Sequence, residues 1–190
     1  MVRKPGPQRV TVTSEGVPRH GNDKPQARTT IDGLCADVAQ AVAGPLAERD
    51  RRVAAALRPY LESADLLPDP ARQSSADRYA RHLLHAGADF TILSLVWRPR
   101  QMSAIHAHQT WCAFGLHRAW LVETLFDRSP SGVRPRDCLQ LHQGEVSHSP
   151  EDAAAVHRLA NLGTETALSI HVYGAPFDRL GELVNTIWAD

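Results

Sequence analysis

The chain has 190 residues, which suits one domain with a sizeable core and is too short for two enzyme domains and a linker. Its 21 basic side chains balance its 21 acidic ones, so the composition gives no reason to expect binding to nucleic acid or anionic lipid. Three cysteines without a CxxC pair (Cys35, Cys112 and Cys138), no apolar run long enough to span a bilayer and no secretory signal predict a soluble protein of the reducing cytoplasm.

The composition changes twice along the chain. Residues 1–28 contain four prolines and six basic residues against two acidic ones, which predicts a flexible basic arm. Residues 29–190 are expected to form a single domain, with a helical prelude over 29–78 and a β-barrel over 79–190.

The prelude has helical spacing. Asp32 can cap a helix that Gly44 and Pro45 stop, and its apolar residues lie three and four positions apart: Leu34, Val38, Ala41 and Val42. A second helix is predicted over residues 46–57, and a further short turn or helix over 60–67. Nothing in this region is chemically unusual, so its expected role is packing.

After Tyr79 the pattern changes to β. Residues 90–97 are apolar on both parities, which predicts a strand covered on both faces. Shorter strands separated by turn residues are predicted at 110–116, 120–126, 144–146, 154–159 and 167–173. The segment 180–188 fits either a covering helix or a last strand. The whole pattern predicts a mainly β protein, a small barrel or jelly roll.

Four of the ten histidines lie in or beside predicted strands: His106, His108, His157 and His171. Residues two apart on a strand face the same way, so His106 and His108 can present both imidazoles to one ion. Continued alternation would add Thr110 and Cys112 to that face. His157, on a later strand, is the natural third ligand. A single strand histidine is usually a hydrogen-bonded structural residue, so this assignment depends on the whole pattern.

That pattern resembles the two cupin motifs. The first is His106-x-His108 followed by Cys112, and the second runs through Gly144, Pro150, His157 and Asn161. Arg100 and Ala119 stand where the first motif usually has glycine. The flanking residues make the resemblance narrower, because they look like the cysteine dioxygenase family of thiol dioxygenases, of bacterial type, over about residues 75–188. They are Tyr79-Ala80-Arg81-His82, Trp97-x-Pro99-x-Gln101, Glu123-Thr124 and Ser169-x-His171-x-Tyr173-Gly174-Ala175-Pro176.

The resemblance implies a cupin jelly-roll barrel preceded by N-terminal helices, and Fe(II) bound by the three imidazoles of His106, His108 and His157. Three such ligands leave up to three positions for substrate and O₂, although a His₃ set also serves zinc chemistry. The implied reaction is oxidation of L-cysteine to cysteine sulfinic acid. Arg81 would clamp the substrate carboxylate with its planar fork. Other carboxylate-bearing thiols, 3-mercaptopropionate and mercaptosuccinate, are alternative substrates.

Ser169, His171 and Tyr173 alternate with apolar residues, so one face of this strand is polar. These three side chains can relay hydrogen bonds that end on the Tyr173 phenol, which would act as an acid or hydrogen-bond donor. Family members that carry a cysteine near Cys112 can join its sulfur to the tyrosine that matches Tyr173. Cys112 is therefore either half of a thioether crosslink or a small buried thiol that fills the barrel.

Two other functions compete with the dioxygenase. A metal-dependent cupin isomerase or hydrolase would need a carboxylate near the metal, and Glu123 and Glu145 do not clearly share parity with His106. A non-catalytic cupin sensor is disfavoured by the Ser-His-Tyr series. The remaining side chains of interest are expected to be structural, solvent-facing or inert: Trp97, Trp111, Phe114, His82, His85, His117, His142, His148, Cys35 and Cys138. The sequence leaves the oligomeric state open.

Overall fold

The computed structural model describes residues 29–130, 132–151, 155–183 and 186–188. The basic arm predicted at residues 1–28 lies outside these ranges. Within them, no helix combines the length and the apolar character that crossing a membrane requires.

Two α-helices come first, α1 (Ile31–Val42) and α2 (Arg49–Leu57). Thr30 rather than Asp32 caps α1, because the Thr30 hydroxyl accepts a hydrogen bond from the Gly33 N–H at 3.1 Å. Asp32 instead lies in the first turn, where its charge suits the helix dipole. Short 3₁₀ helices occupy Leu46–Glu48, Arg58–Tyr60, Asp69–Arg72 and Phe177–Arg179, and a short α-helix, α3, follows at Leu180–Leu183.

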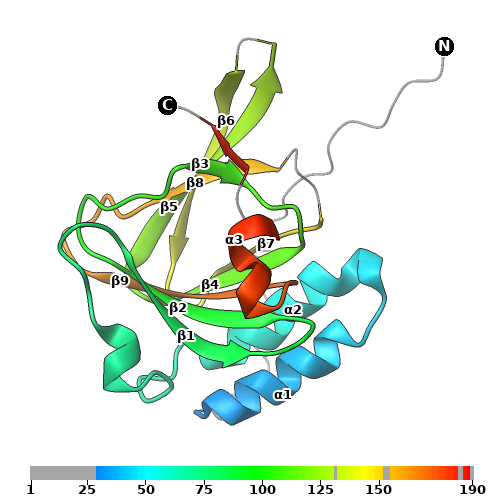
Figure 1. The fold of residues 1–190 in the computed structure, drawn as a ribbon. Coiled ribbons are helices and arrows are strands. Elements are labelled where there is room, and N and C mark those ends of the chain that lie inside the picture. Colours follow the sequence, from blue (N-terminus) through cyan, green and yellow to red (C-terminus); the bar gives the residue numbers. More distant parts are fainter. Residues whose placement is uncertain (1–28, 131, 152–154, 184–185, 189–190) are drawn as a thin grey trace, which may run out of the picture.

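The strands form two five-stranded antiparallel sheets, which face each other in Figure 1. The first sheet has the order β1 (Ala80–Ala86), β2 (Thr91–Trp97), β9 (Ala167–Tyr173), β4 (Cys112–Arg118), β7 (Val146–Ser149). The second has the order β10 (Thr186–Trp188), β3 (Ile105–Ala107), β8 (Val156–Ala160), β5 (Trp120–Ser129), β6 (Gly132–His142). The prediction of a mainly β protein preceded by helices is confirmed.

The buried strand β2 packs against the helices on one face and against the core between the two sheets on the other. Its residues Ile92 and Val96 pack in the cluster that includes α1 and α2, which cover the outer side of the first sheet in Figure 1. Leu93, Leu95 and Trp97 point the other way, into the core between the two sheets. Every residue of β2 is buried, as its two apolar parities predict. Strand β2 therefore borders the space between the two sheets.

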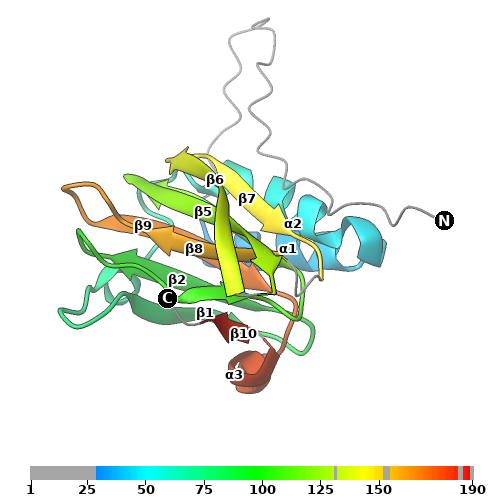
Figure 2. The ribbon, with the colours of Figure 1, turned by 90° about the horizontal axis from the view of Figure 1, so that it is seen from above.

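The strand prediction is incomplete, because it lacks β1 and β6 and contains β3 only through the alternation of His106 and His108, without bounds. The segment over 180–188 contains both predicted alternatives, α3 and then β10, which lie close together in Figure 2. The segment over 60–67 is turn rather than helix beyond Tyr60. The strands predicted at 110–116, 144–146 and 154–159 begin two residues later, as β4, β7 and β8.

Candidate metal centre

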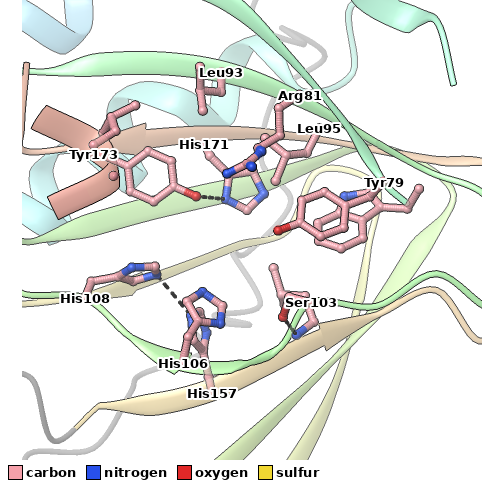
Figure 3. A pocket seen from close by; sticks show the side chains of 14 residues that line it. Tyr79, Arg81, Leu93, Leu95, Ser103, His106, His108, His157, His171 and Tyr173 are labelled. Carbon is pink, nitrogen blue, oxygen red and sulfur yellow. Dashed lines mark hydrogen bonds between the residues drawn. The ribbon is translucent and has the colours of Figure 1, made fainter. Parts of the chain in front are cut away.

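Three histidines converge at the inner side of the second sheet (Figure 3). His106 on β3 and His157 on β8 are register partners across the two strands, and His108 follows just beyond the end of β3. The ring nitrogens that these three residues offer lie within 4.8 Å of one another. His108 and His157 are buried, and His106 is half-buried. Strand pairing thus brings together three residues that lie up to 51 positions apart in the sequence.

The hydrogen bonds of His106 and His157 leave one ring nitrogen of each available to a metal ion. The Nδ1 atom of His157 donates to Glu123 Oε1 at 2.7 Å, and the Nδ1 atom of His106 donates to the Ala104 carbonyl at 3.0 Å. In the neutral rings of His157 and His106, Nε2 is then the unprotonated nitrogen. His157 Nε2 lies 3.1 Å from His108 Nε2.

These nitrogens suit a metal ion. With bonds of about 2.1 Å, two nitrogens at right angles around an ion are separated by about 3.0 Å, close to the distance between His108 and His157. Burial lowers the pKa of His106 to about 3, so its ring is neutral near pH 7. Metal ligation requires neutral imidazole. The donor set therefore fits a bound cation.

Glu123 on β5 lies behind His157 and completes this arrangement. Its side chain is 3% exposed, and Ser147 donates to its second carboxylate oxygen at 2.7 Å. A carboxylate that accepts from the distal nitrogen of a ligating histidine fixes the ring and raises its basicity. The sequence did not predict a carboxylate at the metal, because Glu123 does not clearly share parity with His106. The signal was a glutamate within the largely apolar first part of β5, residues 120–126. Glu145 accepts from the His142 N–H and does not line the pocket.

A cavity of about 80 Å³ opens beside the three histidines, between the sheets (Figure 3). Arg81 on β1 is exposed at this cavity, with its guanidinium carbon 5.8 Å from the centre of the Tyr79 ring. Tyr79 in turn stacks on Trp97 at 4.1 Å. The remaining lining residues are mostly apolar or belong to β9 and α3: Leu93, Leu95, Ser103, Leu159, His171, Tyr173, Leu180 and Gly181.

The polar face of β9 carries a hydrogen-bonded chain. Ser169 Oγ lies 2.8 Å from His171 Nε2, and the Tyr173 hydroxyl lies 3.2 Å from His171 Nδ1. Burial lowers the pKa of His171 to about 3 and raises the pKa of Tyr173 well above its ordinary value. Near neutral pH the imidazole is therefore uncharged and the phenol keeps its hydrogen.

The predicted alternation from His108 to Cys112 does not hold. β3 ends at Ala107 and β4 begins at Cys112, and the intervening Thr110 donates to the Gly174 carbonyl at 2.7 Å instead of lining the pocket. Cys112 nevertheless lies opposite Tyr173, because the two residues are register partners of β4 and β9. Its side chain is 3% exposed, and burial raises the pKa of its thiol.

The other histidines of the described residues do not line the pocket and make structural contacts. His148 pairs with Asp50 at 2.8 Å and so joins β7 to α2. The remaining contacts are His117 with the Leu61 carbonyl, His82 with the Gln73 carbonyl, His85 with the Phe90 ring and His142 with Gln140.

Comparisons with known proteins agree with this geometry. The family model described as cysteine dioxygenase type I matches residues 29–183, so the match includes the helical prelude as well as the barrel. Cysteine dioxygenase type 1 of Rattus norvegicus is 31% identical over 115 residues, which cover 53% of each chain. The Homo sapiens protein of that name is 31% identical over 107 residues, again covering 53% of each chain. The chain thus spans about half the length of the curated relatives it matches.

The fold has a counterpart among crystal structures. An uncharacterized conserved protein with a double-stranded β-helix domain from Klebsiella pneumoniae aligns with a TM-score of 0.50 and 16% identity, over 65% of this chain and 91% of that one. At this identity the likeness shows the fold alone. It confirms the predicted cupin-type barrel.

Proposed function

The chain belongs to the cysteine dioxygenase type I family, and on this basis we propose that it is an Fe(II)-dependent thiol dioxygenase that converts L-cysteine and O₂ into cysteine sulfinic acid. The observation that carries the proposal is the convergence of His106, His108 and His157 beside a pocket with one cationic side chain. Carboxylate-bearing thiols such as 3-mercaptopropionate and mercaptosuccinate are the alternative substrates. Cys35, Cys112 and Cys138 are free thiols, which supports a reducing cytoplasm as the location.

The three histidines would hold the iron, which supplies an open site where a thiolate and O₂ meet. Arg81 binds the substrate carboxylate as a bidentate partner and directs the thiol toward the histidines. The apolar walls formed by Leu93, Leu95 and Leu159 exclude water from the sulfur. Tyr173 donates its hydroxyl hydrogen to the reacting thiol or its oxygens. Both atoms of O₂ end on sulfur, so R–SH and O₂ give R–SO₂H without an external reductant.

The proposal is tested by O₂ uptake and product analysis on a panel of thiols after loading with Fe(II). We expect L-cysteine to consume one O₂ per molecule and to yield the sulfinate by mass spectrometry. Zn(II)-loaded protein is the control and should consume no O₂, because zinc has no redox chemistry. Absence of sulfinate from every carboxylate-bearing thiol with iron bound would overturn the proposal.

Removal of the guanidinium in Arg81→Ala should raise the KM for L-cysteine roughly tenfold and change kcat less. The effect is moderate because Arg81 is exposed, so solvent screens its pairing with the carboxylate. Steady-state kinetics measures both constants, with the exposed Arg98→Ala as a control outside the pocket. Cysteamine lacks the carboxylate and should be a poor substrate of the parent protein. Equal turnover of cysteine and cysteamine would contradict the role of Arg81.

Glu123→Gln should weaken metal binding by about 10- to 100-fold, because the neutral amide cannot raise the basicity of His157 as the carboxylate does. Ser147→Ala removes only the hydrogen bond to the other carboxylate oxygen and should have a smaller effect. Titration of the metal-free proteins with Fe(II) under anaerobic conditions measures the affinity. A Glu123→Gln protein that binds iron as tightly as the parent would show that the carboxylate does not tune the ligand.

We also propose that Cys112 and Tyr173 become crosslinked, since the two buried residues face each other across β4 and β9. A carbon–sulfur bond forms, the thiol and one ring carbon each lose a hydrogen, and O₂ accepts the two electrons. Intact-mass and peptide spectrometry after exposure to iron, thiol and O₂ should show a loss of two hydrogens that links both peptides. Cys112→Ser should lack this loss, and an unmodified Cys112 throughout would refute the crosslink.

A further inference from the structure

The hydrogen-bonded chain on β9 does not begin at Ser169. The indole nitrogen of Trp97 donates to Ser169 Oγ at 2.9 Å, across the pairing of β2 with β9. Trp97 is 1% exposed and Ser169 is fully buried. Two further hydrogen bonds then lead from Ser169 to His171 and from His171 to Tyr173 at the pocket.

The indole sets the direction of the bonds that follow. An indole N–H donates and never accepts, so Ser169 Oγ is an acceptor from Trp97. Trp97 and His171 are the partners of this hydroxyl in the structure. The Ser169 hydrogen therefore points to His171 Nε2, which must accept it.

The opposite arrangement leaves a buried group unsatisfied. If His171 carried its hydrogen on Nε2, Ser169 would accept twice, and its own hydroxyl hydrogen would have no acceptor among the described residues at this fully buried position. The neutral ring then has its hydrogen on Nδ1, which donates to the oxygen of Tyr173. Burial, which lowers the pKa of His171 to about 3, keeps the ring in this singly protonated form.

We propose that Trp97 is a positioning residue that fixes the direction of this chain, so that the hydroxyl hydrogen of Tyr173 is not taken up by His171 and is held for the substrate pocket. The inference rests on the proposed function, because it assigns that hydrogen to the thiol or its oxygens. The sequence predicts only a structural role for Trp97, in the wall or core of the barrel. Its contact with Ser169 gives it a second role, at a position 72 residues away in the sequence.

The first test reads the His171 tautomer in the metal-free protein. Long-range ¹⁵N–¹H NMR of histidine-labelled protein distinguishes a ring with hydrogen on Nδ1 from one with hydrogen on Nε2, and His171→Gln assigns the signals. We expect Nδ1–H in the parent and a mixture of both tautomers in Trp97→Phe, which keeps a ring to stack on Tyr79. Ser169→Ala should produce the same change by breaking the chain one step later.

Trp120→Phe is the matched control, because Trp120 lies on β5 against Gly163 and outside the pocket. It should leave the His171 signals unchanged. An Nε2–H tautomer in the parent would overturn the direction assigned to the chain. An unchanged Nδ1–H tautomer in both Trp97→Phe and Ser169→Ala would overturn the role of Trp97.

The second test uses the iron-loaded protein. Trp97→Phe should lower kcat about tenfold with KM for L-cysteine within about twofold, because the carboxylate contact at Arg81 is untouched. The double variant with Ser169→Ala should be no slower than Ser169→Ala alone, since both act through one chain. Additive losses would overturn a shared role. If the parent oxidises no thiol, the proposed function fails, and the NMR test still decides which way the chain runs.

Discussion

His157→Ala is expected to abolish metal binding and thiol oxidation together. The variant removes a ring nitrogen that lies 3.1 Å from His108 Nε2, and it leaves Oε1 of the buried Glu123 without its hydrogen-bond donor. Two histidines then remain at the site, which is too few to retain iron with three positions open. Elemental analysis after loading should show almost no iron, and O₂ uptake with L-cysteine should fall to background.

The matching control is His142→Ala, because His142 is exposed on β6 and does not line the pocket. This variant should bind one iron per chain and turn over as the parent does. His106→Ala and His108→Ala should behave like His157→Ala. Full iron occupancy in His157→Ala would contradict the ligand assignment, and His171 would be the next residue to replace.

The two sheets contribute different residues to the site. His106, His157 and the supporting Glu123 come from neighbouring strands of the second sheet, β3, β8 and β5. Arg81 and Tyr173 come from the first sheet, on β1 and β9. The cavity lies between them, so the three histidines approach it from one wall, and the residues proposed to bind and protonate the substrate approach it from the opposite wall. A jelly roll supplies this arrangement because the inward parity of every strand meets in one space.

Features with a local pattern could be predicted from the sequence. The His106-x-His108 pair needs only the two-residue period of an extended chain, and the same period identifies the polar face of β9 through Ser169, His171 and Tyr173. The two covered faces of β2 follow from its apolar run. Its place on a later strand made His157 the natural candidate for the third ligand, and the family resemblance then supported this choice.

Features that depend on register or solvent could not be predicted. β6 was missed because most of its residues are exposed, so it has no apolar alternation to detect. In β1 a register shift between Leu83 and His85 breaks the alternation. Glu123 acts on His157 from the adjacent strand, and Trp97 acts on Ser169 across a strand pair, so both contacts exist only once the register is known.

Tyr173→Phe is expected to lower kcat by roughly 100-fold or more, the range in which a positioned proton donor contributes to catalysis. The variant keeps the ring and removes only the hydroxyl, which lies 3.2 Å from His171 Nδ1 and lines the cavity. Since burial raises the pKa of Tyr173 well above its ordinary value, the parent keeps this hydrogen throughout the neutral range. Iron content by elemental analysis should be unchanged, which separates a lost donor from a lost metal.

Two variants make the interpretation specific. Tyr60→Phe removes another buried hydroxyl, one that donates to Asp37 at 2.7 Å among the helices, and should leave kcat unchanged. Cys112→Ala prevents the crosslink but keeps the Tyr173 hydroxyl, so a loss in kcat confined to Tyr173→Phe belongs to the hydroxyl rather than to the thioether. If Tyr173→Phe turned over L-cysteine at the parental rate with full iron, the phenol would not be the donor. The hydrogen-bonded chain that ends on it would then serve the packing of β9 instead of the reaction.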